Sequence, residues 1–253
     1  MAFIDINDRT GIGNLGKGEF ALPSMDGLPI QPLADTDRLR RSIRAMKTLM
    51  QNQNLGDIAA LIPETHDGHL PERMNLLESA IVNEMTTYLE NPTPATLPPI
   101  FHQVQLWGGI AGRSIYVRDG GFAANWNEQS YRHLAIACST PVHEPGSDPR
   151  VPLLIAAADQ IKYFGVSFAT KHARFWAQAG GVKPLPIYDR IVAQGSMGID
   201  AGWNLYGRYV SEMTAHALEA HTDVATLERH AFNAFGTPAG QAWINTRLMP
   251  SHA

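Results

Sequence analysis

The helical spacing of apolar residues in "PERMNLLESAIVNEMTTYLEN" constrains the fold more than any other feature of the sequence. Met74, Leu77, Ile81 and Met85 recur every three or four positions, so in an α-helix they form one apolar stripe. The initial proline suits a first helical turn, and the proline-rich "NPTPATLPP" that follows ends the helix. A helix with one apolar face must pack on other elements, which predicts a helical core.

The same period recurs along most of the chain. In "DTDRLRRSIRAMKTLMQ", Asp37 is a candidate N-cap, and Leu39, Ile43, Met46 and Met50 share a face. The stretch "NEQSYRHLAIACS" is also predicted to be helical. Further helices are predicted at about 150–164, 168–179, 189–195, 203–220, 223–235 and 238–248.

The glycine-rich stretch at 101–126 breaks this pattern. Its glycine pairs and its β-forming residues, as in "SIYVR", predict strand or loop. The chain of 253 residues is long enough for a sizeable core. We expect an extended Gly/Pro-rich arm at 1–35 with a short strand in "AFIDI", an N-terminal helical subdomain at 36–125, and a second helical domain at 126–253. The fold class is mainly α, with a cleft between two helical subdomains.

Cysteine use and hydropathy indicate a soluble cytoplasmic protein. The single cysteine, Cys138, excludes an intramolecular disulfide, which suits a reducing compartment. It lies in an apolar run, so a buried inert thiol is favoured over a nucleophile. The N-terminus lacks the apolar core of a signal peptide. No run of about eighteen apolar residues suggests a membrane span.

The stretch "YFGVSFATKHARFW" places a lysine, Lys171, inside an otherwise apolar segment. It follows an apolar helix and a tight turn, and Ser167 is a candidate cap for the helix that carries the lysine. Pro184 and Pro186 make the next segment extended. Asp189 follows as a candidate N-cap of another helix. Lys171 as a solvated first-turn residue and Asp189 as a cap alone remain open alternatives.

This arrangement resembles the helix-hairpin-helix DNA glycosylases, especially the 8-oxoguanine glycosylase branch. "VSFATK" matches the family's hairpin and lysine, and "LPIYD" matches its loop and aspartate. The resemblance covers residues 128–245 and implies that Lys171 and Asp189 are catalytic. It assigns the DNA-binding hairpin to Val166, Ser167, Phe168, Ala169 and Thr170.

The resemblance implies a specific chemistry. A lysine amine attacks C1′ of a nucleotide, displaces the base and forms a Schiff base with the opened sugar. An apolar pocket lowers the pKa of a lysine by desolvation, and Phe168, Phe175 and Trp176 are predicted to form it. Asp189 would stabilise positive charge on the sugar, and the hairpin amides would hold a phosphate. No cofactor is implied apart from a monovalent cation, which hairpin carbonyls in this family often bind.

Three aromatic or amide residues are candidates to contact the flipped base: Phe175, Trp107 and Gln241. Phe175 stands where oxoguanine enzymes often carry cysteine. Trp107 is equally suited to a core position in its glycine-rich segment, whose glycines permit a close approach. The chain also has Ser167 and Ala169 at family glycine positions, and Ile191 where many relatives have histidine.

The net charge of −4 lacks the basic excess typical of proteins that grip long duplex DNA. A local patch is predicted instead from Arg40, Arg44 and Lys47, which share a helix face. They are candidates for phosphate or partner contact, with a solvated face as the alternative.

Two weaker motifs favour ordinary loops. "GIGNLGKG" has the spacing of a dinucleotide-binding loop but no following helix. His66 and His69 have ligand-like spacing without further ligands, so no metal site is predicted.

We therefore expect a DNA glycosylase, with a following AP-lyase step, that excises a modified purine from DNA or a nucleoside. Proteins with this fold occur beside nucleotide-modifying enzymes in bacterial anti-phage systems. The alternative is a noncatalytic nucleic-acid- or protein-binding module of such a defence system. No membrane partner is expected.

Overall fold

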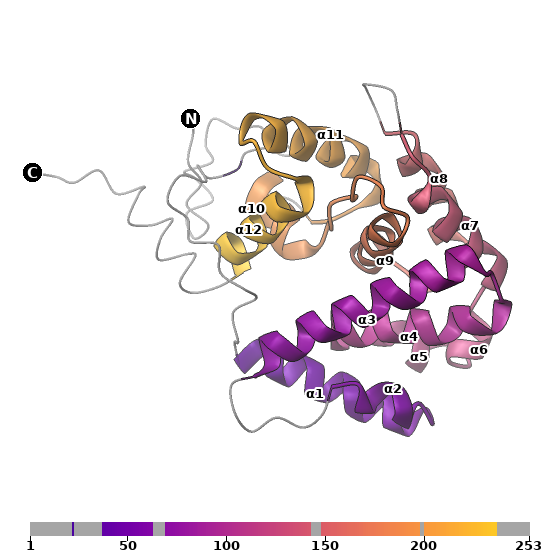
Figure 1. Cartoon of the computed structure of the whole chain (residues 1–253). Helices are drawn as coiled ribbons and strands as arrows, with labels where there is room; N and C mark the ends of the chain where they lie inside the picture. The colour runs from indigo at the N-terminus through magenta and orange to yellow at the C-terminus, as the bar shows by residue number, and fades with distance from the viewer. Residues whose placement is uncertain (1–21, 23–36, 63–68, 143–147, 198–199, 237–253) are drawn as a thin grey trace, which may run out of the picture. The chain divides into compact units, whose positions relative to one another are not determined.

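Figure 1 shows the computed structural model as ribbons. The described residues form twelve α-helices and two short 3-10 helices, and they contain no strand. The prediction of a mainly α protein is therefore confirmed for this part of the chain. The predicted arm at 1–35 lies outside the described residues, apart from Leu22. The structure describes residues 22, 37–62, 69–142, 148–197 and 200–236.

The helices fall into two compact units, Asp35–Leu185 and a second unit described from Pro186 onward. The predicted boundary at 125/126 lies inside the first unit, because α7 packs on α4 as well as on α8 and α9. The first unit contains α1 (Asp37–Asn52), α2 (Gly56–Ala60), α3 (Leu70–Glu90), η1 (Pro94–Thr96), α4 (Leu97–Gly108), η2 (Ile110–Arg113), α5 (Ser114–Val117), α6 (Phe122–Asn125), α7 (Glu128–Ser139), α8 (Arg150–Asp159) and α9 (Val166–Ala179). The second contains α10 (Arg190–Met197), α11 (Trp203–Glu219) and α12 (Val224–Gly236).

The apolar stripes predicted in the first two long helices are buried, except that Leu39 at the start of α1 is only half-buried. Helix α3 packs against α4 and α9, and α1 packs against α2 and α4. Each such side chain contributes about 1.5–3 kcal/mol when it leaves water. Helix α1 begins at Asp37 itself, so this carboxylate lies in the first turn rather than preceding it. The buried stripes are Met74, Leu77, Ile81 and Met85 of α3, and Ile43, Met46 and Met50 of α1.

Helix α9 is the central helix of the first unit. It packs against α3, α4, α7 and α8, and every side chain from Phe168 to Ala177 is buried. A helix surrounded in this way is normally apolar on all sides. Helix α9 instead carries buried Lys171, His172 and Arg174. Buried polar groups cost free energy unless they are paired. The hydrogen-bond partners of these three side chains are therefore important for the stability of this core.

The segment 101–126 is helical, which corrects the prediction of strand or loop. Two prolines occupy the first turn of α4, where a proline loses only an amide that has no intrahelical acceptor. The helix ends at Gly108, and the next residue, Gly109, has a φ of 76°, a left-handed conformation that favours glycine. Ile115 and Tyr116 are buried in α5. Packing therefore decides their conformation over intrinsic β propensity.

The helices around Lys171 also differ from prediction at their ends. Helix α8 ends at Asp159 rather than near residue 164, and α9 begins at Val166 with Gly165 as its N-cap. Ser167 therefore lies inside the first turn of α9 and is not its cap. The ends of α10, α11 and α12 agree with prediction within two residues. The helix predicted at 238–248 lies outside the described residues.

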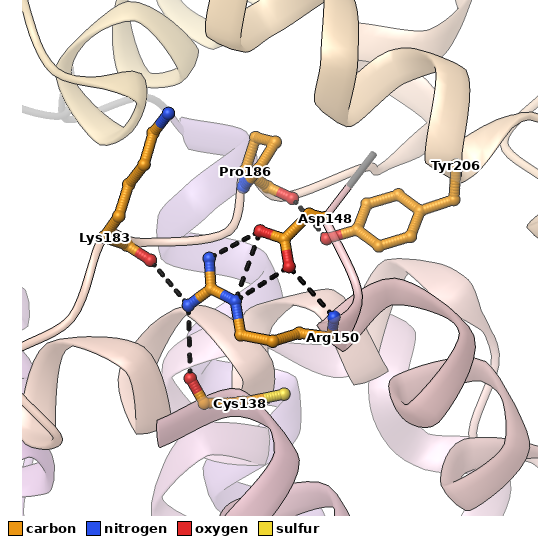
Figure 2. A network of polar contacts seen from close by, with 6 residues as sticks. All are labelled: Cys138, Asp148, Arg150, Lys183, Pro186 and Tyr206. Atoms are coloured by element: carbon orange, nitrogen blue, oxygen red, sulfur yellow. Dashed lines mark hydrogen bonds and ion pairs between the residues drawn. The ribbon is translucent and has the colours of Figure 1, made fainter. Parts of the chain in front are cut away.

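A buried arginine fixes the extended segment that follows α9 (Figure 2). Nε and Nη2 of Arg150 donate to the carboxylate of Asp148 at 3.0 and 2.7 Å. Its Nη1 donates to the carbonyl oxygens of Lys183, at 2.8 Å, and Cys138, at 3.4 Å. Cys138 lies in the last turn of α7, so one side chain joins α7, α8 and the segment after α9.

Candidate functional site

Lys171 lies in the second turn of α9, and its side chain is almost enclosed. The residue is 8% exposed. Its Nζ donates to the carbonyl oxygen and to the hydroxyl of Ser167, each at 3.2 Å. Nζ also lies 5.1 Å from the centre of the Phe168 ring, within the range of a cation–π contact. The sequence placed this lysine in the first turn of its helix, whereas the structure places it one turn further on.

Two glycines make room for Phe168 beside this lysine. A methyl group on Gly108 would lie 2.4 Å from a ring carbon of Phe168 and 3.3 Å from Cδ of Lys171. A methyl group on Gly112 would lie 2.6 Å from the same ring and 2.1 Å from Oε1 of Gln105. These glycines permit the close approach of an aromatic side chain of α9.

We expect Gly112→Ala to lower the free energy of unfolding by about 1–3 kcal/mol, because the new methyl overfills this part of the core. Gly56→Ala is the matched control. A methyl group at Gly56 meets nothing within 4 Å, so this change should stabilise the protein by about 0.4–1 kcal/mol. Denaturant unfolding of both variants measures the difference. Equal stabilities would show that Phe168 and Gln105 move aside without cost.

His172 anchors α9 to two neighbouring helices through a buried polar chain. The hydroxyl of Tyr131 lies 2.7 Å from Nδ1 of His172, and the side-chain amide nitrogen of Gln105 lies 3.3 Å from Nε2. Burial, followed by the nearby charge of Lys171, holds the pKa of His172 well below its usual range. The ring is therefore neutral near pH 7, with Nε2 accepting from Gln105 and Nδ1 donating to Tyr131. This arrangement fixes the rotation of α9, and hence the direction of Lys171.

The three aromatic residues predicted to surround the lysine have different environments. Phe168 covers Lys171, as described above. Phe175 is fully buried, and its ring meets the half-buried Trp107 edge-to-face at 5.0 Å. Trp176 packs edge-on against Tyr88 of α3, at 5.5 Å. Trp176 is therefore a core residue on another side of α9 from Lys171, because residues five apart do not share a helix face.

Trp107 packs in the core of the first unit, but its polar atom is not satisfied there. Its ring packs on Phe175, whereas its Nε1 is buried without a hydrogen-bond partner among the described residues. A buried donor without an acceptor costs free energy, so a ligand acceptor at this atom would recover part of that cost. Gln241, the other candidate contact to a base, lies outside the described residues.

The five residues assigned to the hairpin form the start of α9, so Val166 and Ser167, which precede the helix predicted from residue 168, are helical as well. The connecting turn comprises residues 160–165 instead. Amides of Phe168 and Ala169 donate to the carbonyl oxygen of Gly165, both at 3.0 Å. Of the five predicted phosphate-binding amides, those of Val166 and Ser167 have no acceptor within the helix, as at the start of any α-helix.

Asp189 belongs to the second unit and caps α10. Its Oδ1 accepts from the amides of Ile191, at 2.9 Å, and Val192, at 3.1 Å, which confirms the predicted N-cap. Two tyrosines of α11 fix the backbone before it. Tyr206 donates to the carbonyl oxygen of Pro186 and Tyr209 to that of Ile187, each at 3.1 Å (Figure 2 shows the first). No local pattern in the sequence indicates these contacts.

The predicted basic face lies on α1 in the first unit. Arg44 is exposed, and Arg40 and Lys47 are half-buried at its edge. These three residues lie roughly a quarter of a turn from the buried stripe of the same helix. The face is therefore accessible to an anion or a partner.

Of the remaining sequence motifs, the structure describes Cys138 and His69. Cys138 is buried, as predicted, and this burial raises the pKa of its thiol to about 12. Nδ1 of His69 lies 3.4 Å from Glu72, and His66 and the "GIGNLGKG" motif lie outside the described residues. Within the described ranges, no three His, Cys, Asp or Glu residues gather in a way that could hold a metal. No helix there has the length and apolar character needed to cross a bilayer.

Comparisons with family models, with curated proteins and with solved structures find no match to the chain.

Proposed function

We propose that the chain is a DNA glycosylase that removes a modified purine through a Schiff base on Lys171. The observation that carries this proposal is the position of the lysine. The residue is 8% exposed, and its amine lies beside Phe168 and bonds to Ser167 one turn earlier, inside a helix that His172 holds in place. A lysine held in apolar surroundings has the environment that nucleophilic catalysis by an amine requires.

The proposed step begins with the free amine of Lys171 attacking C1′ of the target nucleotide. The N–C1′ bond forms while the glycosidic bond breaks, and the base leaves with the bonding electron pair and takes up a proton. Loss of a proton from nitrogen and opening of the sugar give a protonated Schiff base. β-Elimination of the 3′ phosphate from this species would supply the AP-lyase activity.

Asp189 is proposed to stabilise the positive charge that develops on the sugar. Its Oδ1 is held by two helix amides, and Tyr209 anchors the backbone two residues earlier. A carboxylate fixed in this way needs little reorganisation when charge develops near it. The amides of Val166 and Ser167, together with Arg44 and its neighbours on α1, are the proposed phosphate contacts.

Borohydride trapping tests the proposal. Hydride adds to C1′ of the Schiff base and leaves a stable secondary amine, so the wild-type protein should form a covalent adduct with an oligonucleotide that contains its lesion. Lys171→Gln should abolish the adduct. Lys183→Gln, which removes an exposed lysine from the same unit, should retain it. An adduct that persists in Lys171→Gln would exclude Lys171 as the nucleophile.

The contact between Phe168 and Lys171 favours a second candidate function. In this conformation the ring lies over the amine, as would suit a chain that keeps the fold without the chemistry. The protein would then be a noncatalytic binding module, with nucleic acid or other anti-phage defence proteins as partners. A wild-type protein that binds oligonucleotides with diverse base modifications, yet gives no adduct with any of them, would establish this alternative.

A further inference from the structure

The turn at residues 160–165 exposes two side chains between two buried ones. Ile161 and Phe164 are buried, and the Phe164 ring lies 5.0 Å from that of His172. Lys162 and Tyr163 are exposed between them, and Tyr163 keeps 38% of its surface accessible. The core therefore fixes the backbone on both sides of an exposed cation and an exposed aromatic ring.

Tyr163 occupies a conformation that a bulky side chain rarely adopts. Its φ is 61°, and Asp119 in the neighbouring loop has a φ of 44°. Glycine or asparagine would take such a conformation with less strain. Strained conformations persist only where the surrounding structure enforces them, and they cluster at sites that contact ligands. Because the exposed ring contributes little to the core, packing alone does not explain a tyrosine here.

The loop that contains Asp119 holds the ring in a single orientation. The guanidinium carbon of Arg118 lies 5.4 Å from the centre of the Tyr163 ring, and the Tyr163 hydroxyl donates to the Asp119 carboxylate. That hydrogen bond raises the pKa of the Tyr163 phenol, so the ring stays uncharged near a phosphate. The carboxylate is paired with the phenol, whereas Arg118 and Lys162 present positive charge to solvent.

We propose that Tyr163 and Arg118 form a stacking site for an unpaired base of single-stranded nucleic acid, with Lys162 contacting its phosphate. An exposed aromatic ring offers a stacking face to any base that is not already stacked in a duplex. An arginine beside the ring adds a planar cation that can contact a base or a phosphate. The net charge of −4 also fits a short single strand better than a long duplex. This inference names the strandedness of the substrate and rests on the proposed function for the class of partner.

Fluorescence anisotropy with a labelled oligo-dT and with a duplex of equal length tests this site. The wild-type protein should prefer the single strand. Tyr163→Asn removes the ring and keeps a residue that tolerates a positive φ, so it should fold normally and bind roughly 5- to 150-fold more weakly. Tyr163→Phe retains the stacking face and should bind within about twofold of wild type. Arg118→Ala should also weaken binding.

The two proposals can fail separately. If folded Tyr163→Asn binds the single strand as wild type does, or if the wild type prefers duplex, the stacking site is wrong whatever Lys171 does. If wild type binds neither DNA form nor oligo-U, the exposed turn serves another partner and the inference is overturned. If Tyr163→Asn loses binding while no lesion gives a borohydride adduct, the stacking site stands and the glycosylase proposal fails.

Discussion

Replacing Arg150 by methionine should lower the free energy of unfolding by about 3–5 kcal/mol, the loss typical of a broken buried ion pair. Arg150 is 2% exposed, and the carboxylate of Asp148 is largely shielded with it. Methionine fills a similar volume but leaves that carboxylate without its charged partner. It also removes the donor to the Lys183 and Cys138 carbonyl oxygens. Unpaired buried acceptors add to the loss.

Chemical denaturation of three further variants separates these contributions. Arg132→Met removes an exposed arginine from α7 and should change stability by less than about 0.5 kcal/mol. Arg150→Lys keeps the charge but loses the planar set of donors, so it should fall between wild type and Arg150→Met. Adding Asp148→Leu to Arg150→Met should restore part of the loss, because the stranded carboxylate is gone. Equal stability of Arg150→Met and Arg132→Met would contradict the role assigned to this network.

Features set by local spacing were the ones that the sequence could predict. The stripe of α3 is visible because an apolar face repeats with the period of a helix. The Asp189 cap is visible because an acceptor after a proline-rich segment precedes a helical pattern. Both depend on residues within a few positions of one another. The turn before α9 is misplaced by a few residues in the prediction, because a tyrosine at positive φ, such as Tyr163, cannot be recognised from the sequence.

Contacts between distant segments could not be predicted in the same way. Gly108 and Gly112 were recognised as sites of close approach, but nothing local identifies Phe168 as the group that approaches. The chain from Tyr131 through His172 to Gln105 joins α7, α9 and α4, and a single sequence contains no record of such pairing. The prediction of strand or loop at 101–126 was wrong for a related reason: burial in the first unit overrides the β propensity of these residues.

The second large effect is expected on acidification, through two buried histidines of the first unit. Nδ1 of His102 lies 2.8 Å from the Tyr116 hydroxyl, and burial lowers the pKa of His102 to about 4. Burial and the neighbouring Lys171 hold the pKa of His172 well below its usual range. Both rings are therefore neutral in the folded protein at pH values where an unfolded histidine, with a pKa of about 6.5, is already protonated.

The sign of the pH dependence follows from proton binding. Between pH 6.5 and pH 4 the unfolded chain binds more protons than the folded one, so stability falls as the pH falls. Each histidine contributes about 1.4 kcal/mol per pH unit in this window, and His102 alone about 3 kcal/mol by pH 4. The contribution of both rings is fully present above about pH 6.5.

Denaturant unfolding from pH 7.5 to pH 4.5 should show this loss in the wild-type protein, and single variants should divide it. A glutamine at position 102 can still bond to Tyr116 but cannot titrate. In His102→Gln, the slope of the free energy of unfolding against pH should therefore fall by the equivalent of about one bound proton. His172→Gln should weaken it similarly, because a glutamine can still meet Tyr131. His133→Gln, at an exposed position on α7, is the control and should leave the dependence unchanged. If His102→Gln and His172→Gln both retain the wild-type slope, the acid sensitivity arises from other groups, and the low pKa assigned to these two histidines is wrong.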